Sequence, residues 1–251
     1  MYSALYQFFT LFPDLQQNKF YITGESYAGK YVPAVSYTIH KNNEAAKMKI
    51  NLKGLAIGNG LCDPLHQLEY GAYLYQLGLI DTIGMNTFKA YEEKGRQCIA
   101  KKDFEGAFDV FDELINMDQL PSGSLFKNMT GFTTYFNYLQ QEDDGSDKPM
   151  AAFLKRTDVR KALHVGSLPF HGLDGDENKV EEHLKLDVMD TIAPYLSELL
   201  SHYRVCIYNG QVSDKLASNS QNCFMIRILF FLVGHNRRLP SHNKLLEAIA
   251  F

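Results

Sequence analysis

The first residues of the chain have the hydrophobic spacing of an amphipathic helix. Apolar side chains recur three to four residues apart, which places them on one face of a helix. Pro13 cannot continue such a helix because it lacks a backbone N–H. We therefore expect a helix over residues 2–12 that covers one face of a sheet. Its apolar positions are Leu5, Phe8, Phe9 and Phe12.

Strand-like and helix-like segments alternate along the rest of the chain. Residues 20–22 and 52–57 are short apolar runs that predict buried strands, and residues 27–40 between them have helical spacing. Residues 204–208 predict another strand, which Asn209 and Gly210 end. Strands separated by helices are typical of an α/β protein with a mostly parallel sheet.

The middle of the chain is predicted to be helical. Charged and apolar positions alternate at helical spacing from residue 63 to about residue 120, and further helices are expected over residues 158–164 and 182–201. This long helical stretch would be an insertion over one edge of the sheet. The apolar stripe within it is expected to face a core and not a ligand. Its members are Phe104, Phe108, Phe111 and Leu114.

Composition and charge narrow the classes of partner. The chain has 251 residues, of which 45% are hydrophobic, so it can bury the core of one large domain or two small ones. A net charge of -4, with no basic run longer than Arg237-Arg238, argues against nucleic acid and anionic membrane surfaces as partners. No apolar stretch approaches the roughly 20 residues of a membrane-spanning helix. The residues after Met1 lack the basic region and cleavage site of a signal peptide.

The cysteines and one possible N-glycosylation site say little about the function of the chain. The four cysteines lie far apart without CxxC spacing, which argues against a zinc site and leaves disulfide pairing open. The triplet Asn128-Met129-Thr130 fits the N-glycosylation pattern, and its use would depend on a secretory route. The cysteines are Cys62, Cys98, Cys206 and Cys223.

A serine at the corner between a strand and a helix is the candidate nucleophile. Gly24 to Ala28 form a Gly-x-Ser-x-small turn between the two elements, which is the setting of a nucleophile elbow. Such a turn would hold Ser26 at the positive end of the helix, where its backbone and that of Tyr27 could face a developing oxyanion. The alternative is a serine that caps the helix. The preceding strand and the following helix favour catalysis.

Four separate motifs resemble the serine carboxypeptidases, most closely the vitellogenic-like branch. They are GESYAGKYVPA, LKGLAIGNGLCDP, RTDVRKALHVG and HYRVCIYNGQ, in that order between Tyr2 and Gln211. The resemblance implies an α/β-hydrolase fold with a helical cap, which would be residues 81–168 within a single domain, residues 1–251. It also implies a Ser-Asp-His triad without metal or cofactor, release of single C-terminal residues from peptides, and a secreted, lysosomal or vacuolar setting.

The resemblance gives substrate-binding roles to residues beside the serine. In this family the glutamate before the nucleophile helps to recognise the terminal carboxylate of the peptide, and here that residue is Glu25. Two carboxyl groups can share a hydrogen bond only while one is protonated, which would favour an acidic working range. The alternative is a solvated surface glutamate. Tyr27, Asn59 and Gly60 complete the predicted substrate site, although a turn alone would explain Asn59 and Gly60.

The acid and the base depend on less regular matches. In the family the acid follows the last strand as Gly-x-x-Asp, whereas here Asp214 comes one position later. One residue of slip turns a side chain to the opposite face, so Asp214 needs a compensating bulge. His235 is the candidate base, and four residues separate it from Pro240 where relatives have two. Aligning that proline instead puts Arg237 at the position of the base.

Three hypotheses follow from these matches and gaps. In the first, the chain is a hydrolase in which Ser26 attacks, His235 takes and returns the proton, and Asp214 orients the imidazole. In the second, it is a catalytically impaired homologue that binds a peptide or a partner protein. In the third, an alcohol replaces water as the acyl acceptor.

Relatives also carry a long upstream segment that supplies a second oxyanion amide. The chain is therefore expected to be a partial carboxypeptidase with an incomplete sheet, and its oligomeric state is left open.

Overall fold

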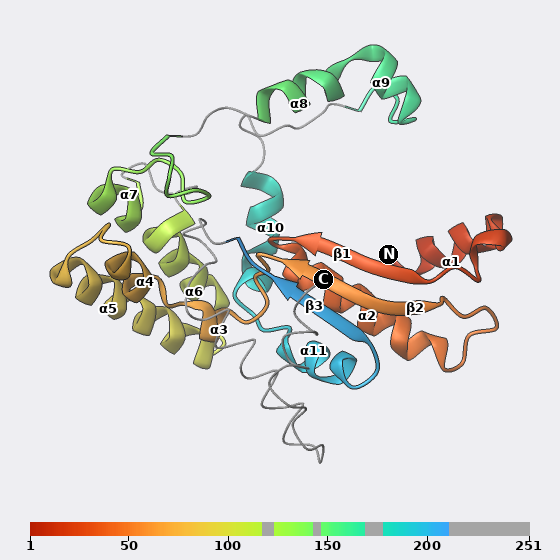
Figure 1. The fold of residues 1–251 in the computed structure, drawn as a ribbon, viewed down its shortest axis with the longest axis horizontal. Helices are drawn as coiled ribbons and strands as arrows, with labels where there is room; N and C mark the ends of the chain where they lie inside the picture. Colours follow the sequence, from red (N-terminus) through yellow and green to blue (C-terminus); the bar gives the residue numbers. More distant parts are fainter. Residues whose placement is uncertain (117–122, 143–146, 169–177, 211–251) are drawn as a thin grey trace, which may run out of the picture. The chain divides into compact units, whose positions relative to one another are not determined.

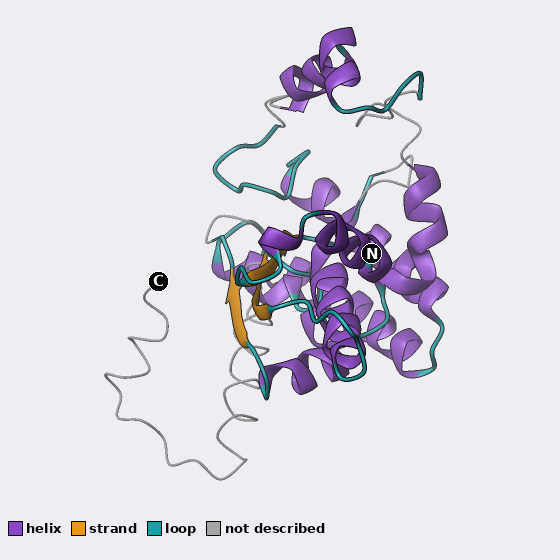
Figure 2. Ribbon diagram, turned by 90° about the vertical axis from the view of Figure 1, so that its right-hand side faces the viewer, coloured by secondary structure: helices purple, strands orange, loops and turns teal. Residues whose placement is uncertain are grey.

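The chain folds into two compact units. The computed structural model describes residues 1–116, 123–142, 147–168 and 178–210. Among these, residues 1–67 and 191–210 form one unit, called here the sheet unit, and those between 68 and 190 form the other, called the helical unit. The strands of the described residues, orange in Figure 2, all belong to the sheet unit. That the helical unit caps an active site stays a prediction.

Three parallel strands form the sheet of the described residues. Their order is β1 (Phe20–Glu25), β2 (Leu52–Gly58) and β3 (Arg204–Tyr208) (Figure 1). Glu25 pairs with Gly58, which pairs with Tyr208, so the carboxyl ends of the strands meet at one edge. The predicted parallel α/β architecture and all three predicted strands are confirmed, and β1 extends three residues beyond the predicted run.

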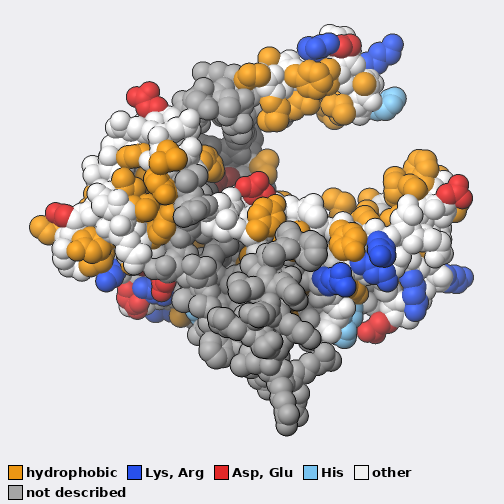
Figure 3. Space-filling view, in the orientation of Figure 1, with side chains coloured by type: hydrophobic (Ala, Val, Ile, Leu, Met, Phe, Trp, Pro, Cys, Tyr) orange, Lys and Arg blue, Asp and Glu red, His pale blue; other side chains and the backbone are white. Residues whose placement is uncertain are grey.

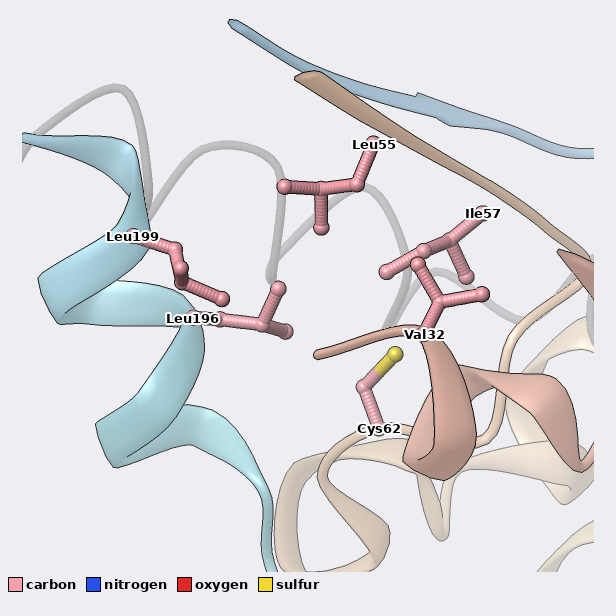
Figure 4. Close-up of a cluster of buried hydrophobic side chains, with 6 residues drawn as sticks. All are labelled: Val32, Leu55, Ile57, Cys62, Leu196 and Leu199. Carbon is pink, nitrogen blue, oxygen red and sulfur yellow. The ribbon is translucent and has the colours of Figure 1, made fainter. Parts of the chain in front are cut away.

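One face of the sheet is covered by helices. α2 (Ala28–Asn43) and α11 (Ala193–Leu200) pack their apolar side chains against those of β2 (Figure 4). Full burial of each such side chain contributes roughly 1.5–3 kcal/mol. Next to this cluster, Phe9 of α1 (Tyr2–Leu11) packs against Ile39 and Leu52, which confirms the predicted first helix. The cluster in Figure 4 comprises Val32, Leu55, Ile57, Cys62, Leu196 and Leu199.

The structure differs from the single helix predicted over residues 182–201. α10 (Asn178–Val188) ends in the helical unit, and α11 starts again at Ala193 in the sheet unit. Between them the N–H of Ile192 donates to the carbonyl of Cys62 (2.9 Å) and not to a helical carbonyl. Pro194, in the first turn of α11, has no N–H with which to continue a preceding helix. The apolar spacing runs through this break and conceals it.

Helices packed around aromatic residues make up the helical unit. Of the predicted stripe, Phe108, Phe111 and Leu114 are buried and Phe104 is half-buried, which confirms its core-facing role. Asp81 caps α5 by accepting from the N–H of Gly84 (2.8 Å). No helix of the described residues is long and apolar enough to cross a membrane. The elements are α4 (Tyr70–Gln76), α5 (Thr82–Ala100), α6 (Phe104–Phe111), a π-helical turn (Asp112–Asn116), α7 (Leu125–Thr130), α8 (Asp147–Lys155), α9 (Thr157–Ala162) and α10.

Candidate active site

Ser26 lies at the corner between β1 and α2, on a left-handed backbone. Its φ is +79°, which is uncommon for a residue other than glycine and costs roughly 1–2 kcal/mol. Three backbone hydrogen bonds hold it there. The N–H of Ser26 donates to Gly58 O (3.1 Å), and its carbonyl accepts from the N–H groups of Gly29 (2.9 Å) and Leu61 (3.0 Å). Surrounding structure that over-determines a strained residue is typical of functional sites.

Helix capping does not explain this serine. The residue at the N-cap position of α2 is Tyr27, and no side chain makes a capping hydrogen bond there. Ser26 is exposed, at the carboxyl end of a strand and the amino end of a 16-residue helix. The geometry of this corner therefore does not support a helix-capping role for Ser26.

Small residues are needed around the corner for steric reasons. A Cβ atom added to Gly24 would lie 2.5 Å from the Cβ of Ala28. One added to Gly29 would lie 2.6 Å from the backbone N of Leu61 and 2.8 Å from the carbonyl C of Gly60. Real Cβ atoms essentially never approach other atoms this closely. The strand, the helix and the loop after β2 can thus meet only because these side chains are absent.

Asn59 connects the ends of the three strands. Its Nδ2 donates to Oε1 of Glu25 (3.1 Å), and its Oδ1 accepts from the N–H of Gly210 (2.8 Å). The N–H of Asn59 donates to the carbonyl of Tyr208 (3.0 Å). Because Oδ1 is committed to a backbone donor, the donor end of the amide faces the carboxyl group of Glu25. Its φ of +42° is one that asparagine tolerates better than most residues.

Gln67, at the end of α3 (Pro64–Gln67), supports the loop after β2 from inside. Its side chain is buried, with Oε1 accepting from the N–H groups of Cys62 and Asp63 (2.8 Å each) and Nε2 donating to Gly60 O (2.9 Å). Burial raises the pKa of the Cys62 thiol to about 12, which makes it a poor nucleophile. Sequence analysis missed Gln67, because a hydrophobic period does not mark a buried polar residue.

Of the other predicted site residues, the structure describes two and leaves two outside the described ranges. Tyr27 is half-buried, with its ring edge-on to that of Tyr31 (4.9 Å between centroids), and Gly60 is buried. Asp214 and His235 lie outside the described residues. Among the predicted residues, the structure thus brings Glu25 and Asn59 into hydrogen-bond contact next to Ser26. Within the described ranges, no three His, Cys, Asp or Glu side chains are arranged to hold a metal ion, and Cys62, Cys98 and Cys206 are free thiols.

One protein-family model identifies the family of the chain. A family model described as serine carboxypeptidase matches residues 1–230, which is most of the chain. The chain belongs to the serine carboxypeptidase family. The family resemblance of the four sequence motifs is thereby confirmed.

Individual serine carboxypeptidases match over most of this chain. It is 55% identical to the venom serine carboxypeptidase of Apis mellifera over 213 residues, which cover 84% of this chain and 45% of that protein. It is 48% identical to the vitellogenic carboxypeptidase of Aedes aegypti over 229 residues, 89% of this chain and 47% of that protein. The chain therefore spans about half the length of the curated relatives it matches.

A carboxypeptidase of known structure has a similar fold. It is Kex1Δp, a prohormone-processing carboxypeptidase from Saccharomyces cerevisiae, with a TM-score of 0.65 and 21% identity. The match covers 84% of this chain and 48% of that one. The predicted α/β-hydrolase fold is confirmed, and the described residues supply a small parallel part of its sheet.

Proposed function

We propose that the chain carries the nucleophile and the carboxylate-recognition group of a serine-type carboxypeptidase, which hydrolyses C-terminal residues from peptides. The observation that supports this most is the exposed Ser26 at φ +79°, between a strand and a helix in a serine carboxypeptidase chain. A nucleophile elbow requires this combination of a strained turn and an exposed hydroxyl.

Ser26 attacks the scissile carbonyl in this proposal. The amino end of α2 carries a partial positive charge, and the backbone amide of Tyr27 faces the developing oxyanion. The N–H of Ser26, which the sequence also offered for this role, donates to Gly58 O instead (3.1 Å). His235 accepts the serine proton and returns it to the leaving amine, and Asp214 orients the imidazole. Water then hydrolyses the acyl-enzyme and restores Ser26.

Glu25 supplies specificity for a free C-terminus in this proposal. The hydrogen bond from Asn59 Nδ2 holds Oε1 of Glu25. The other carboxyl oxygen can then carry a proton and donate a hydrogen bond to the terminal carboxylate of the peptide. A peptide amide in place of that carboxylate would lose the charge-assisted hydrogen bond. Glu25 is exposed, and the hydrogen bond from Asn59 supports a fixed orientation of its carboxyl group.

The setting of the enzyme belongs to the same proposal. One relative is named for venom, and Asn128 of the acceptor triplet is exposed on α7. Both observations fit a secreted or lysosomal glycoprotein that works on peptides at acidic pH. Expression in insect cells behind an added secretion signal, followed by enzymatic removal of N-glycans, should shift the electrophoretic mobility of the wild-type chain and leave that of Asn128→Gln unchanged.

A fluorophosphonate probe tests the nucleophile. We expect the purified chain to be labelled at Ser26, labelling to disappear in Ser26→Ala, and release of one residue from a blocked dipeptide. His235→Ala and Arg237→Ala form a matched pair, because only the true base should be required for labelling. Labelling without release in water, but with transfer to an added alcohol, would favour acyl transfer. Absence of labelling would overturn the proposal and favour a peptide-binding homologue.

A further inference from the structure

A row of lysines leads into β2. Along residues 47–53, alternate positions face the core, as in an extended chain, and the positions between them are exposed except for the half-buried Asn51. The inward residues pack against Phe9 and Ile39, and the outward residues include three exposed lysines. The inward positions are Met48, Ile50 and Leu52, and the lysines are Lys47, Lys49 and Lys53.

These lysines line one wall of a groove. Its volume is about 760 Å³, and its other wall consists of α1 and the turn after it, with Tyr6, Thr10 and Gln16. None of the residues that line it is acidic. Within the described part of the chain, none of its three lysines forms an ion pair or hydrogen bond. Three uncompensated positive charges in one groove are unexpected in a chain with a net charge of -4.

Further cations lie at the same edge of the sheet. Lys19 directly precedes β1, and Arg204 is the first residue of β3 and pairs with Gly54, next to Lys53. Both are exposed. A basic residue thus lies at or next to the start of each of the three parallel strands. Figure 3 shows blue side chains gathered over the end of the sheet where β2 begins. The sequence conceals this patch because the residues come from three separate segments.

Side-chain amides fix the shape of the groove. Asn43 holds the backbone of Ile50 from both sides, donating to its carbonyl (2.8 Å) and accepting from its N–H (3.0 Å). Asn51 donates to the carbonyls of Gln17 (3.0 Å) and Asn18 (3.2 Å), which joins the two walls. A groove built in this way is preorganised, so a ligand does not have to order it.

We propose that this groove binds a sulfated polysaccharide. The lysines would pair with sulfate groups, the side-chain amide of Gln17 would hydrogen-bond sugar hydroxyls, and the ring of Tyr6 would contact a sugar face. Gln16 donates its Nε2 to Phe9 O (2.9 Å) and offers only its Oε1 as an acceptor. A concave groove with polar walls suits an extended glycan chain better than a flat lipid surface. The groove lies at the amino ends of the strands, whereas Ser26 follows a carboxyl end, so the proposal does not depend on catalysis.

Heparin is the probe for the test. We expect the full chain to bind it, with an affinity that falls as salt rises, and the triple variant Lys47→Gln, Lys49→Gln, Lys53→Gln to bind about tenfold more weakly or worse. The matched control, Lys89→Gln, Lys101→Gln, Lys155→Gln, removes three exposed charges from the helical unit and should bind as the wild type does. Ser26→Ala should also bind normally, which separates this result from the fate of the proposed activity.

Other outcomes would overturn the proposal. Equal losses in both triple variants would indicate attraction by net charge alone. Equal affinity for desulfated heparin would exclude sulfate recognition, and equal affinity for phosphatidylserine vesicles or duplex DNA would exclude a glycan site. Thermal melting of each variant shows whether a loss of binding comes from unfolding.

Discussion

The close approach of Gly29 to the loop after β2 yields the most direct prediction. In Gly29→Ala the new Cβ would lie 2.6 Å from the N of Leu61 and 2.8 Å from its O and from the C of Gly60. These are backbone atoms, so no flexible side chain can yield. Reaching an ordinary contact of 3.4 Å requires the loop to withdraw by roughly 0.8 Å.

The size of the effect follows from three contributions. Overpacking of this kind costs about 1–3 kcal/mol, and the Leu61 N–H to Ser26 O hydrogen bond is worth about 1 kcal/mol. Alanine is favoured over glycine within a helix by about 1 kcal/mol. We therefore expect a net loss of about 1–3 kcal/mol in the free energy of unfolding. In a chain of this size that lowers Tm by about 2–4 °C for each kcal/mol.

Two assays measure the effect of Gly29→Ala, one on the whole fold and one at Ser26. Thermal unfolding followed by circular dichroism measures the loss of stability, and the rate of fluorophosphonate labelling measures whether Ser26 keeps its orientation. Gly78→Ala is the control, because its Cβ would meet no atom within 4 Å and only its φ of +72° opposes the change. It should cost about 1 kcal/mol through backbone strain and leave labelling unchanged. Wild-type stability and labelling in Gly29→Ala would refute the reasoning.

Three further substitutions test other parts of the structure. Glu25→Gln should weaken the preference for free over amidated C-termini at acidic pH, measured as a ratio of kcat/KM values, and an unchanged ratio would exclude the recognition role. Gln67→Leu should lower the free energy of unfolding by about 2–4 kcal/mol in urea, because three buried backbone groups lose their partners; a cost below about 1 kcal/mol would contradict this. Burial raises the pKa of the Glu92 carboxyl, so the folded state holds that proton more tightly and stability falls as pH rises above the unfolded value. Glu92→Gln should therefore be more stable than wild type at pH 7 and lose the advantage near roughly pH 4, whereas an advantage that persists at acidic pH would point to a cause other than charge.

Elements with a strong local signal could be predicted from the sequence. The strands were predictable because each is a short apolar run between breakers, and the turn at Ser26 because small residues flank a serine between a strand and a helix. The break between α10 and α11 was missed although Pro194 marks the start of α11, because the apolar spacing runs through it and the hydrogen bond from Ile192 to the distant Cys62 is not visible in the sequence. The bridging role of Asn59 was missed for the same reason: its side-chain partners, Glu25 and Gly210, are 34 and 151 residues away in sequence.

The position of Asn59 has a consequence for how specificity and chemistry relate. One side of its amide orients Glu25, and the other holds Gly210, from which the chain continues toward Asp214. A shift in the path that leaves the third strand therefore changes the hydrogen bond that aims Glu25. If Glu25 recognises the C-terminus of the peptide and Asp214 is the catalytic acid, as proposed, substitution of Asn59 should change KM and kcat together.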